Sequence, residues 1–271
     1  MKRIAFLTVL QSLLLIIAVP ALGLAATGPV LIVHDGTVGI EADVLGNLTT
    51  HLAAAGYTVS SSVGVPAGSL AANKQIWDVR FNNTTPLTAA DITAYSTYLA
   101  GGGSLFVMGE NTGFMTRDNS IAALVTAVGG GTLTISTPAN SETVQSPFTG
   151  PNPLSTITFL AAAGATSPPG KGAFVTKDGS NIGASVVFSP GTMSAATNGS
   201  LILVFDVNFL QVGADANSQT FTDNLIAYLA APVPVVAATV PTVSEWGMTV
   251  MAMLMLGAAV VAMRRRRRES L

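Results

Sequence analysis

Residues 101–111 have the sequence Gly-Gly-Gly-Ser-Leu-Phe-Val-Met-Gly-Glu-Asn, and this stretch decides the expected fold. Its centre, 104–108, is a short apolar run between glycines, which is typical of a strand buried within a sheet. Before it, the sequence predicts a helix from Thr88 to Ala100, because Thr88 can cap the helix and Asp91 stands in the capping-box position. A helix that leads directly into a buried strand is the repeating unit of an α/β protein with a parallel sheet.

The segment on the N-terminal side repeats this pattern. Residues 29–33 predict a buried strand, 57–61 a second strand and 75–79 a third. Between the first two lies a predicted helix, whose apolar residues recur every four positions: Ile40, Val44, Leu48 and Leu52. This βαβ opening predicts a parallel sheet with a right-handed crossover.

The segment on the C-terminal side changes character before the pattern returns. Residues 120–128 predict a helix, 200–205 a further parallel strand and 219–229 a last helix. Within residues 132–190, some segments alternate apolar and polar residues and others are rich in Pro and Gly. A hairpin signal stands at 177–179. This region therefore predicts an antiparallel excursion or extra edge strands. The expected fold class is therefore α/β, with a flavodoxin-like parallel sheet that carries helices on both faces.

Composition excludes several functions for the body of the chain. The 271 residues include no cysteine, which excludes a disulfide framework, a thiolate metal site and a cysteine nucleophile. Residues 27–235 contain five basic and twelve acidic residues, a net charge of −7. An acidic body with scattered basic residues argues against nucleic-acid binding.

The N-terminus has the layout of a secretory signal peptide. Lys2 and Arg3 precede the apolar run 4–19, Pro20 breaks it, and the small residues that follow suit a cleavage site near residue 26. The alternative is an uncleaved N-terminal anchor. A signal peptide implies the secretion machinery and a signal peptidase as partners.

The C-terminus combines an apolar segment with a basic cluster. Residues 247–263 carry no charge, enough for a short transmembrane helix, and Arg264, Arg265, Arg266, Arg267 and Arg268 follow as a membrane stop. This arrangement predicts an inner-membrane helix with a cytoplasmic tail at 264–271. A nucleic-acid-binding tail and a buried core helix are the alternatives that it disfavours.

The segment before this helix completes a known pattern. Its residues are Val240, Pro241, Thr242, Val243, Ser244, Glu245, Trp246 and Gly247. With the helix and the arginines, it resembles the IPTL-type C-terminal sorting signal, a relative of the PEP-CTERM signals of Gram-negative bacteria. The usual Ile-Pro-Thr-Leu-Ser-Glu-Trp-Gly motif is changed only by valine at 240 and 243. The resemblance implies an exosortase-family enzyme as partner, transient anchoring, and a final place at the cell surface or outside the cell.

The body resembles the class I glutamine amidotransferase-like fold. The matching pieces are the opening strand and helix, the block 101–111, and the segments 204–209 and 224–229. Amidotransferase chemistry needs a cysteine on a strand–turn–helix elbow, so the resemblance implies that this activity is absent and that Glu110 lies near the position of the lost nucleophile.

Polar residues follow several of the predicted strands. In open parallel sheets, ligands bind outside the carboxyl ends of the strands. The candidate catalytic residues there are His34, Asp35, Glu110 and Asp206, with Asp78, Asn111 and Asn208 nearby in the pattern. His34 is the one credible base, because His51 is expected at the surface of the first helix. The alternative is that these Asp and Asn residues cap loops and helix N-termini.

The sequence therefore divides into five segments: signal peptide 1–26, amidotransferase-like domain 27–231, linker and sorting motif 232–246, transmembrane helix 247–263 and basic tail 264–271. The leading hypothesis is an exported surface or matrix protein with a non-catalytic binding domain, and no cofactor or metal is predicted. The alternatives are an envelope or extracellular hydrolase that uses the strand-end carboxylates, and a permanently anchored single-span protein.

Overall fold

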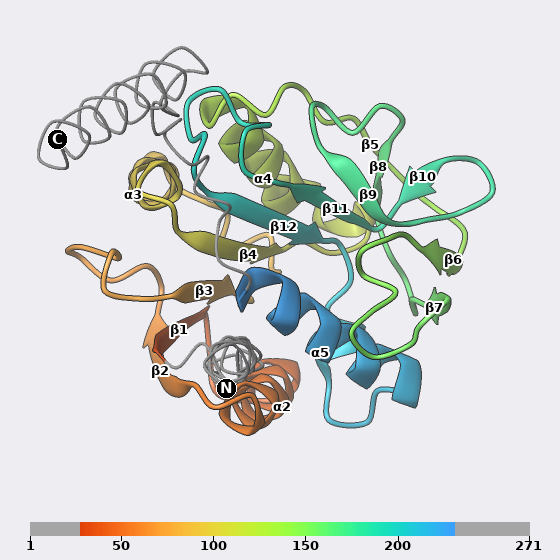
Figure 1. Cartoon of the computed structure of the whole chain (residues 1–271), viewed down its shortest axis with the longest axis horizontal. Coiled ribbons are helices and arrows are strands. Elements are labelled where there is room, and N and C mark those ends of the chain that lie inside the picture. Colours follow the sequence, from red (N-terminus) through yellow and green to blue (C-terminus); the bar gives the residue numbers. More distant parts are fainter. Residues whose placement is uncertain (1–27, 231–271) are drawn as a thin grey trace, which may run out of the picture. The chain divides into compact units, whose positions relative to one another are not determined.

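The strand predicted at 104–108 lies in the middle of a nine-stranded sheet with the order β2-β1-β3-β4-β12-β11-β9-β6-β7 (Figure 1). The structure is a computed structural model that describes residues 28–230. The first five strands in this order run parallel to their neighbours: β2 (Thr58–Val63), β1 (Pro29–His34), β3 (Gln75–Asp78), β4 (Ser104–Met108) and β12 (Ser200–Val204). Their order corresponds to the 2-1-3-4-5 arrangement of flavodoxin-like sheets.

The other four strands are antiparallel, which confirms the antiparallel excursion predicted for residues 132–190 and makes the sheet mixed rather than wholly parallel. They are β11 (Ser185–Phe188), β9 (Ala173–Lys177), β6 (Ser141–Val144) and β7 (Thr156–Thr158). A parallel connection needs a crossover of a dozen or more residues. No helix is present between 128 and 207 to provide one, and the chain returns through turns and short strands. A second, three-stranded sheet forms here from β10 (Ile182–Gly183), β8 (Gly164–Thr166) and β5 (Ile135–Ser136).

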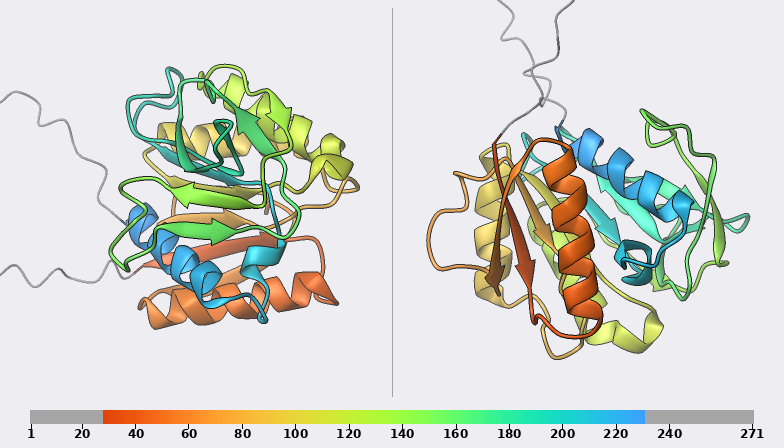
Figure 2. Two further views of the ribbon diagram at one scale, coloured as in Figure 1. Left: turned by 90° about the vertical axis from the view of Figure 1, so that its right-hand side faces the viewer. Right: turned by 90° about the horizontal axis from the view of Figure 1, so that it is seen from below.

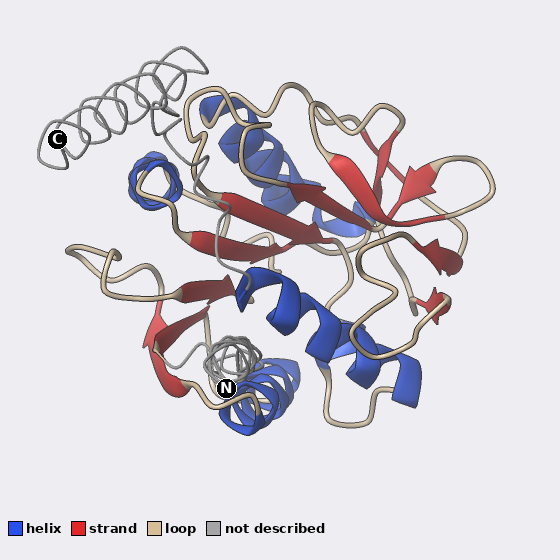
Figure 3. Ribbon diagram, in the orientation of Figure 1, coloured by secondary structure: helices blue, strands red, loops and turns tan. Residues whose placement is uncertain are grey.

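Helices cover both faces of the large sheet, as predicted. In Figure 1, α2 (Ile40–Ala54) and α5 (Ala216–Ala230) lie below the sheet, and α3 (Ala89–Ala100) and α4 (Met115–Ala127) lie above it. The right-hand view of Figure 2 shows α2 and α5 in front of the strands that they cover. Figure 3 shows the strands in red between the blue helices of the two faces. Buried side chains form one core beneath each pair of helices, so the sheet separates two hydrophobic layers.

Local capping fixes where the helices of the second layer begin. The Thr88 side chain accepts the N–H of Asp91, and the Asp91 side chain accepts the N–H of Thr88, which is the predicted capping box. The next helix, α4, begins at Met115 rather than at the predicted Ser120, because the 3₁₀ turn η1 (Thr112–Phe114) leads directly into it. Asn111 caps this turn by accepting the N–H of Gly113.

Several predicted features of the two ends of the chain lie outside the described residues, so the structure does not test them. These are the signal peptide 1–26, the motif 240–247, the transmembrane helix 247–263 and the arginines 264–268. Within residues 28–230, no helix is long and apolar enough to cross a membrane.

Candidate functional site

The four predicted site residues all lie at the carboxyl edge of the parallel strands. His34 ends β1 and Asp35 follows it, whereas Glu110 and Asp206 each stand two residues beyond a strand, β4 and β12 respectively. His34, Glu110 and Asp206 are almost fully buried. The structure therefore places them at the expected edge, but it does not expose their side chains as a catalytic cleft requires.

Hydrogen bonds from a main-chain and a side-chain N–H occupy the carboxylate of Glu110. Its Oε2 accepts the N–H of Val207 at 2.7 Å, and its Oε1 accepts the side-chain N–H of Asn111 at 3.0 Å. Burial raises the pKa of Glu110 from 4.5 to about 7, and the nearby negative charge of Asp206 adds to this rise, while the two hydrogen bonds oppose it. The side chain thus ties the end of β4 to the segment after β12.

Asp206 and Glu142 hold other main-chain segments in the same way. Asp206 accepts the N–H of Ala161 at 3.1 Å and that of Asn208 at 2.7 Å, and burial raises its pKa. Both oxygens of Glu142 lie within 3.1 Å of the N–H of Ala184, and burial raises the pKa of Glu142 to about 7. Asp206 thus joins the segment after β12 to the antiparallel excursion, whereas Glu142 joins two segments within that excursion.

His34 and Asp35 make separate contacts. The Nδ1 of His34 donates to the carbonyl of Gly36 at 2.8 Å, since a carbonyl can only accept. Asp35 Oδ2 accepts the hydroxyl of Thr85 at 2.9 Å, whereas its buried Oδ1 has no hydrogen-bond partner. No hydrogen bond joins either residue to Glu110 or Asp206 within the described part of the chain.

The carboxyl end of β3, which lies between β1 and β4 in the sheet, carries a buried ionic cluster. Asp78 forms ion pairs with Arg80 at 2.7 Å and Arg117 at 3.1 Å, and it accepts the hydroxyl of Tyr95 at 2.9 Å. Arg80 also reaches Asp91 at 3.4 Å. Burial alone would raise the pKa of Asp78, but the two guanidinium groups outweigh it and hold the pKa below its usual value. Two acids and two arginines balance here, so this cluster is structural.

Asp118 lies between the ionic cluster and Glu110. Its Oδ1 accepts the N–H of Glu110 at 3.1 Å, and its buried Oδ2 has no hydrogen-bond partner. Burial raises the pKa of Asp118 to about 7, with the charge of Glu110 adding and that of Arg117 opposing. The residues 28–230 contain no group of three or more acidic or histidine side chains placed to hold a metal ion.

Sequence reasoning missed Asp118, Arg117 and Glu142. A signal for Glu142 was present, because residues 141–144 alternate and the burial of Val144 implies an inward-facing position 142. Arg117 and Asp118 carried no such signal, since the helix was predicted to begin after them. His51 was also placed wrongly at the free surface, because its ring lies between α2 and α5 and contacts Asp223 at 2.6 Å and Gln219 at 2.5 Å.

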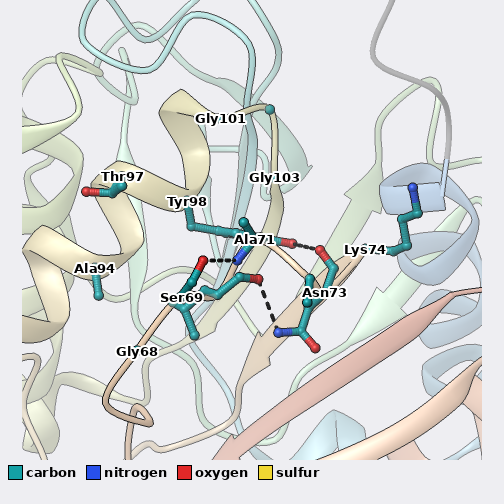
Figure 4. A pocket seen from close by; sticks show the side chains of 13 residues that line it. Gly68, Ser69, Ala71, Asn73, Lys74, Ala94, Thr97, Tyr98, Gly101 and Gly103 are labelled. Atoms are coloured by element: carbon teal, nitrogen blue, oxygen red, sulfur yellow. Dashed lines mark hydrogen bonds between the residues drawn. The ribbon is translucent and has the colours of Figure 1, made fainter.

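Three cavities of the described domain differ in their position on the sheet. One of about 450 Å³ lies at the amino edge, between the segment before β3 and the end of α3; Figure 4 shows Tyr98 and Asn73 hydrogen-bonded within its wall. A second, of about 480 Å³, lies between α2 and α5 beside His51. The third, of about 490 Å³, lies at the carboxyl edge, and none of the four predicted site residues lines it or the other two.

The carboxyl-edge cavity has a polar lining from several elements. Asp43 comes from the first turn of α2, and Asn208 and Gln211 from the region of the 3₁₀ turn η2 (Asn208–Leu210). Asp215 lies at the start of α5, where it accepts the N–H of Ser218 at 2.8 Å. The lining is completed by Asn140, Thr158, Phe159, Leu160, Phe209, Gly213, Ala214 and Ser218. Asp43 and the side chain of Leu160 are exposed, so a ligand could reach the cavity from solvent.

Comparison with known proteins identifies the C-terminal segment and the fold of the body. Residues 238–268 match the IPTL-CTERM motif, as predicted from the residues 240–247 and the segment that follows them. No curated protein matches the sequence.

Two solved structures show the fold of the described domain. The mmIFT52 N-terminal domain is similar with a TM-score of 0.54 at 14% identity, covering 74% of this chain and 97% of that one. A protein described as ThuA-like from Bacteroides uniformis has a TM-score of 0.50 at 12% identity, covering 74% and 91%. At these identities the likeness concerns the fold alone, and it is consistent with the amidotransferase-like resemblance of the body.

Proposed function

We propose that this protein is exported, processed at its C-terminal sorting signal, and retained at the cell surface or in the extracellular matrix, where its α/β domain binds a ligand without catalysis. The match of residues 238–268 to the IPTL-CTERM motif carries the first part of the proposal. The processing partner is an exosortase-family enzyme of the inner membrane, and the apolar segment 247–263 with its arginines anchors the chain until it is cut.

The intact mass of the protein from membrane and medium fractions of its host tests the processing. Loss of the first 26 residues and of everything beyond the motif supports a sorted surface protein. A mass that retains the arginines 264–268 in every fraction contradicts it and favours a permanent anchor.

The hydrogen bonds of the strand-end carboxylates support a non-catalytic domain. Glu110 and Asp206 already accept main-chain N–H groups, and neither lines any of the three cavities described above. A general acid or base must reach its substrate within hydrogen-bond distance. These side chains stabilise the fold instead, which disfavours the hydrolase alternative.

The carboxyl-edge cavity is the binding site that the arrangement favours. It lies where ligands of open α/β sheets bind, beyond the ends of the parallel strands. Carboxylate, amide and hydroxyl groups line it, with apolar surface from Leu160. Such a lining suits a neutral, hydroxyl-rich ligand, and a polysaccharide of the cell envelope or matrix is therefore the proposed class.

Binding of extracellular polysaccharide from the host to the purified protein tests this assignment. Asp43→Ala, at the exposed side of the cavity, is expected to weaken binding by at least roughly fivefold, because a hydrogen bond to a charged group contributes about 1.5–3 kcal/mol. Thr97→Ala, in the amino-edge cavity, is the matched control and should leave binding unchanged. Equal binding by both variants and the wild type would place the ligand elsewhere.

A further inference from the structure

The edge strand β2 leaves a row of main-chain groups without partners. Thr58 donates its N–H to Gly28 at 3.3 Å and Gly64 donates to His34 at 2.9 Å, so even-numbered residues of β2 face β1. In a parallel pair the alternate residues direct their N–H and C=O groups away from the neighbouring strand. These are Val59, Ser61 and Val63, and within the described residues no hydrogen bond reaches their main-chain groups.

The opposite edge of the sheet is protected, which makes β2 exceptional. Strand β7 has three residues, and the side chain of Asn217 from α5 donates to the outward carbonyl of Thr156 at 3.2 Å. Proteins commonly block edge strands by shortness, charge, proline or a bulge. The sequence of β2, Thr-Val-Ser-Ser-Ser-Val, is six residues long and has no charge or proline, and its pairing with β1 has no irregularity.

We propose that β2 pairs with β2 of a second copy of this chain across a two-fold axis, joining the two sheets edge to edge. An antiparallel register centred on Ser61 places Ser61 opposite Ser61 and Val59 opposite Val63. In this register every outward N–H faces a C=O of the other copy, which an off-centre register cannot achieve. A two-fold contact requires a self-complementary surface, and this strand provides one.

Side chains near the edge favour a second copy as the occupant. Val63 is 72% exposed, although it is a large apolar residue, and the register covers it with Val59 of the other chain. Valine pairs across antiparallel strands are stabilising. No charge on β2 meets its own copy. The helix α2 beside it has only one charged residue among its exposed positions, which are Ile40, Asp43, Gly46, Thr50, Ala53 and Ala54.

Single cysteines in the full chain test the register. The chain has no cysteine, so each variant carries one thiol. Residues directly opposite in a hydrogen-bonded antiparallel pair have Cα atoms about 5.5 Å apart, within the range of a disulfide. Ser61→Cys should therefore form a disulfide-linked dimer under mild oxidation, at least roughly tenfold faster than Ser60→Cys or Ser62→Cys, whose own copies lie diagonally at about 7–8 Å.

Further variants separate this dimer from random contact. An equimolar mixture of Ser60→Cys and Ser62→Cys should form the mixed dimer, because residues 60 and 62 oppose each other in the register. Ser61→Lys should convert the wild-type dimer, measured by light scattering, to a monomer with an unchanged circular dichroism spectrum. Equal cross-linking of all three single variants, or a monomeric wild type that binds extended peptides at β2 instead, would overturn the proposal.

Discussion

Asp78 on one face of the large sheet and Glu110 and Glu142 on the other are buried acids with opposite pKa shifts. On the face covered by α3 and α4, Asp78 is paired with two arginines and its pKa is lowered. On the face covered by α2 and α5, Glu110 and Glu142 have no arginine and rely on main-chain N–H groups, and burial raises their pKa values to about 7. Burial is common to all three acids, so the difference between them is the presence of a counter-charge. Asp118, which lies on α4 without an ion pair among residues 28–230 and also has a raised pKa, follows the same rule.

The largest expected effect comes from removing a counter-charge on the α3/α4 face. Arg117→Met leaves the fully buried Asp78 with one arginine and removes donors from the carbonyls of Met108 and Thr85. Breaking a buried ion pair from one side costs about 3–5 kcal/mol. Urea unfolding at pH 7 should show a loss of this size, and Lys171→Met, at an exposed lysine, should change stability by less than about 0.5 kcal/mol. A loss below about 1 kcal/mol for Arg117→Met would mean that the cluster is not held by its charges.

The raised pKa values on the α2/α5 face predict how the free energy of unfolding depends on pH. The dependence has the opposite sign to that expected from an acid paired with arginine. Between pH 4.5 and about 7 the unfolded chain releases protons that Glu110 and Glu142 keep in the folded state. The folded state then binds more protons than the unfolded state, so stability falls as pH rises through this window. One such shift corresponds to roughly 3 kcal/mol.

Urea unfolding between pH 5 and pH 8 measures this loss. The paired Asp78 does not cancel it, because a lowered pKa contributes stability that is already complete above the ordinary pKa of 3.8. Stability that is constant or rises over this range would show that these carboxylates are ionised at low cost, and the comparison between the faces would fail.

A single amide substitution sharpens the comparison. Glu142→Gln keeps an oxygen to accept the N–H of Ala184 but removes the charge, so it mimics the protonated acid. We expect roughly 1–2 kcal/mol of added stability at pH 8, and no gain at pH 5, where Glu142 is already neutral. Glu41→Gln, on the surface side of α2, should leave the pH profile unchanged. A gain of equal size at both pH values would point to packing rather than charge.

The sequence predicted the parallel half of the fold better than the antiparallel half. Buried strands such as 104–108 and the helix after Thr88 carry local signals, namely an unbroken apolar run and a capping box. The strand β6 buries Glu142 and Val144 between exposed residues, and its partners lie far along the chain, so no local pattern determines its pairing.

The candidate site shows the same division between local and distant information. Position at a strand end was predictable for His34, Glu110 and Asp206, because it depends only on where a strand stops. Their burial and hydrogen bonding were not predictable. Glu110 accepts a hydrogen bond from Val207, 97 residues away in the sequence, and Asp206 accepts one from Ala161, 45 residues away. Burial and hydrogen bonding of these acids are properties of the assembled sheet.

The smallest predicted effect concerns Asp91, which lies at the edge of the ionic cluster around Asp78. Thr88→Ala removes the side-chain acceptor of the Asp91 N–H, and loss of such a cap costs about 1 kcal/mol. Asp91 also contacts Arg80, so a freed Asp91 would weaken the cluster from its edge. Thr93→Ala on the same helix is the control: its hydroxyl donates to the carbonyl of Ala89, and alanine favours a helix at an exposed position, so stability should be unchanged or slightly higher. Urea unfolding of both variants should therefore differ by about 1 kcal/mol, and equal stabilities would mean that Arg80 and Asp78 hold the start of α3 without the cap.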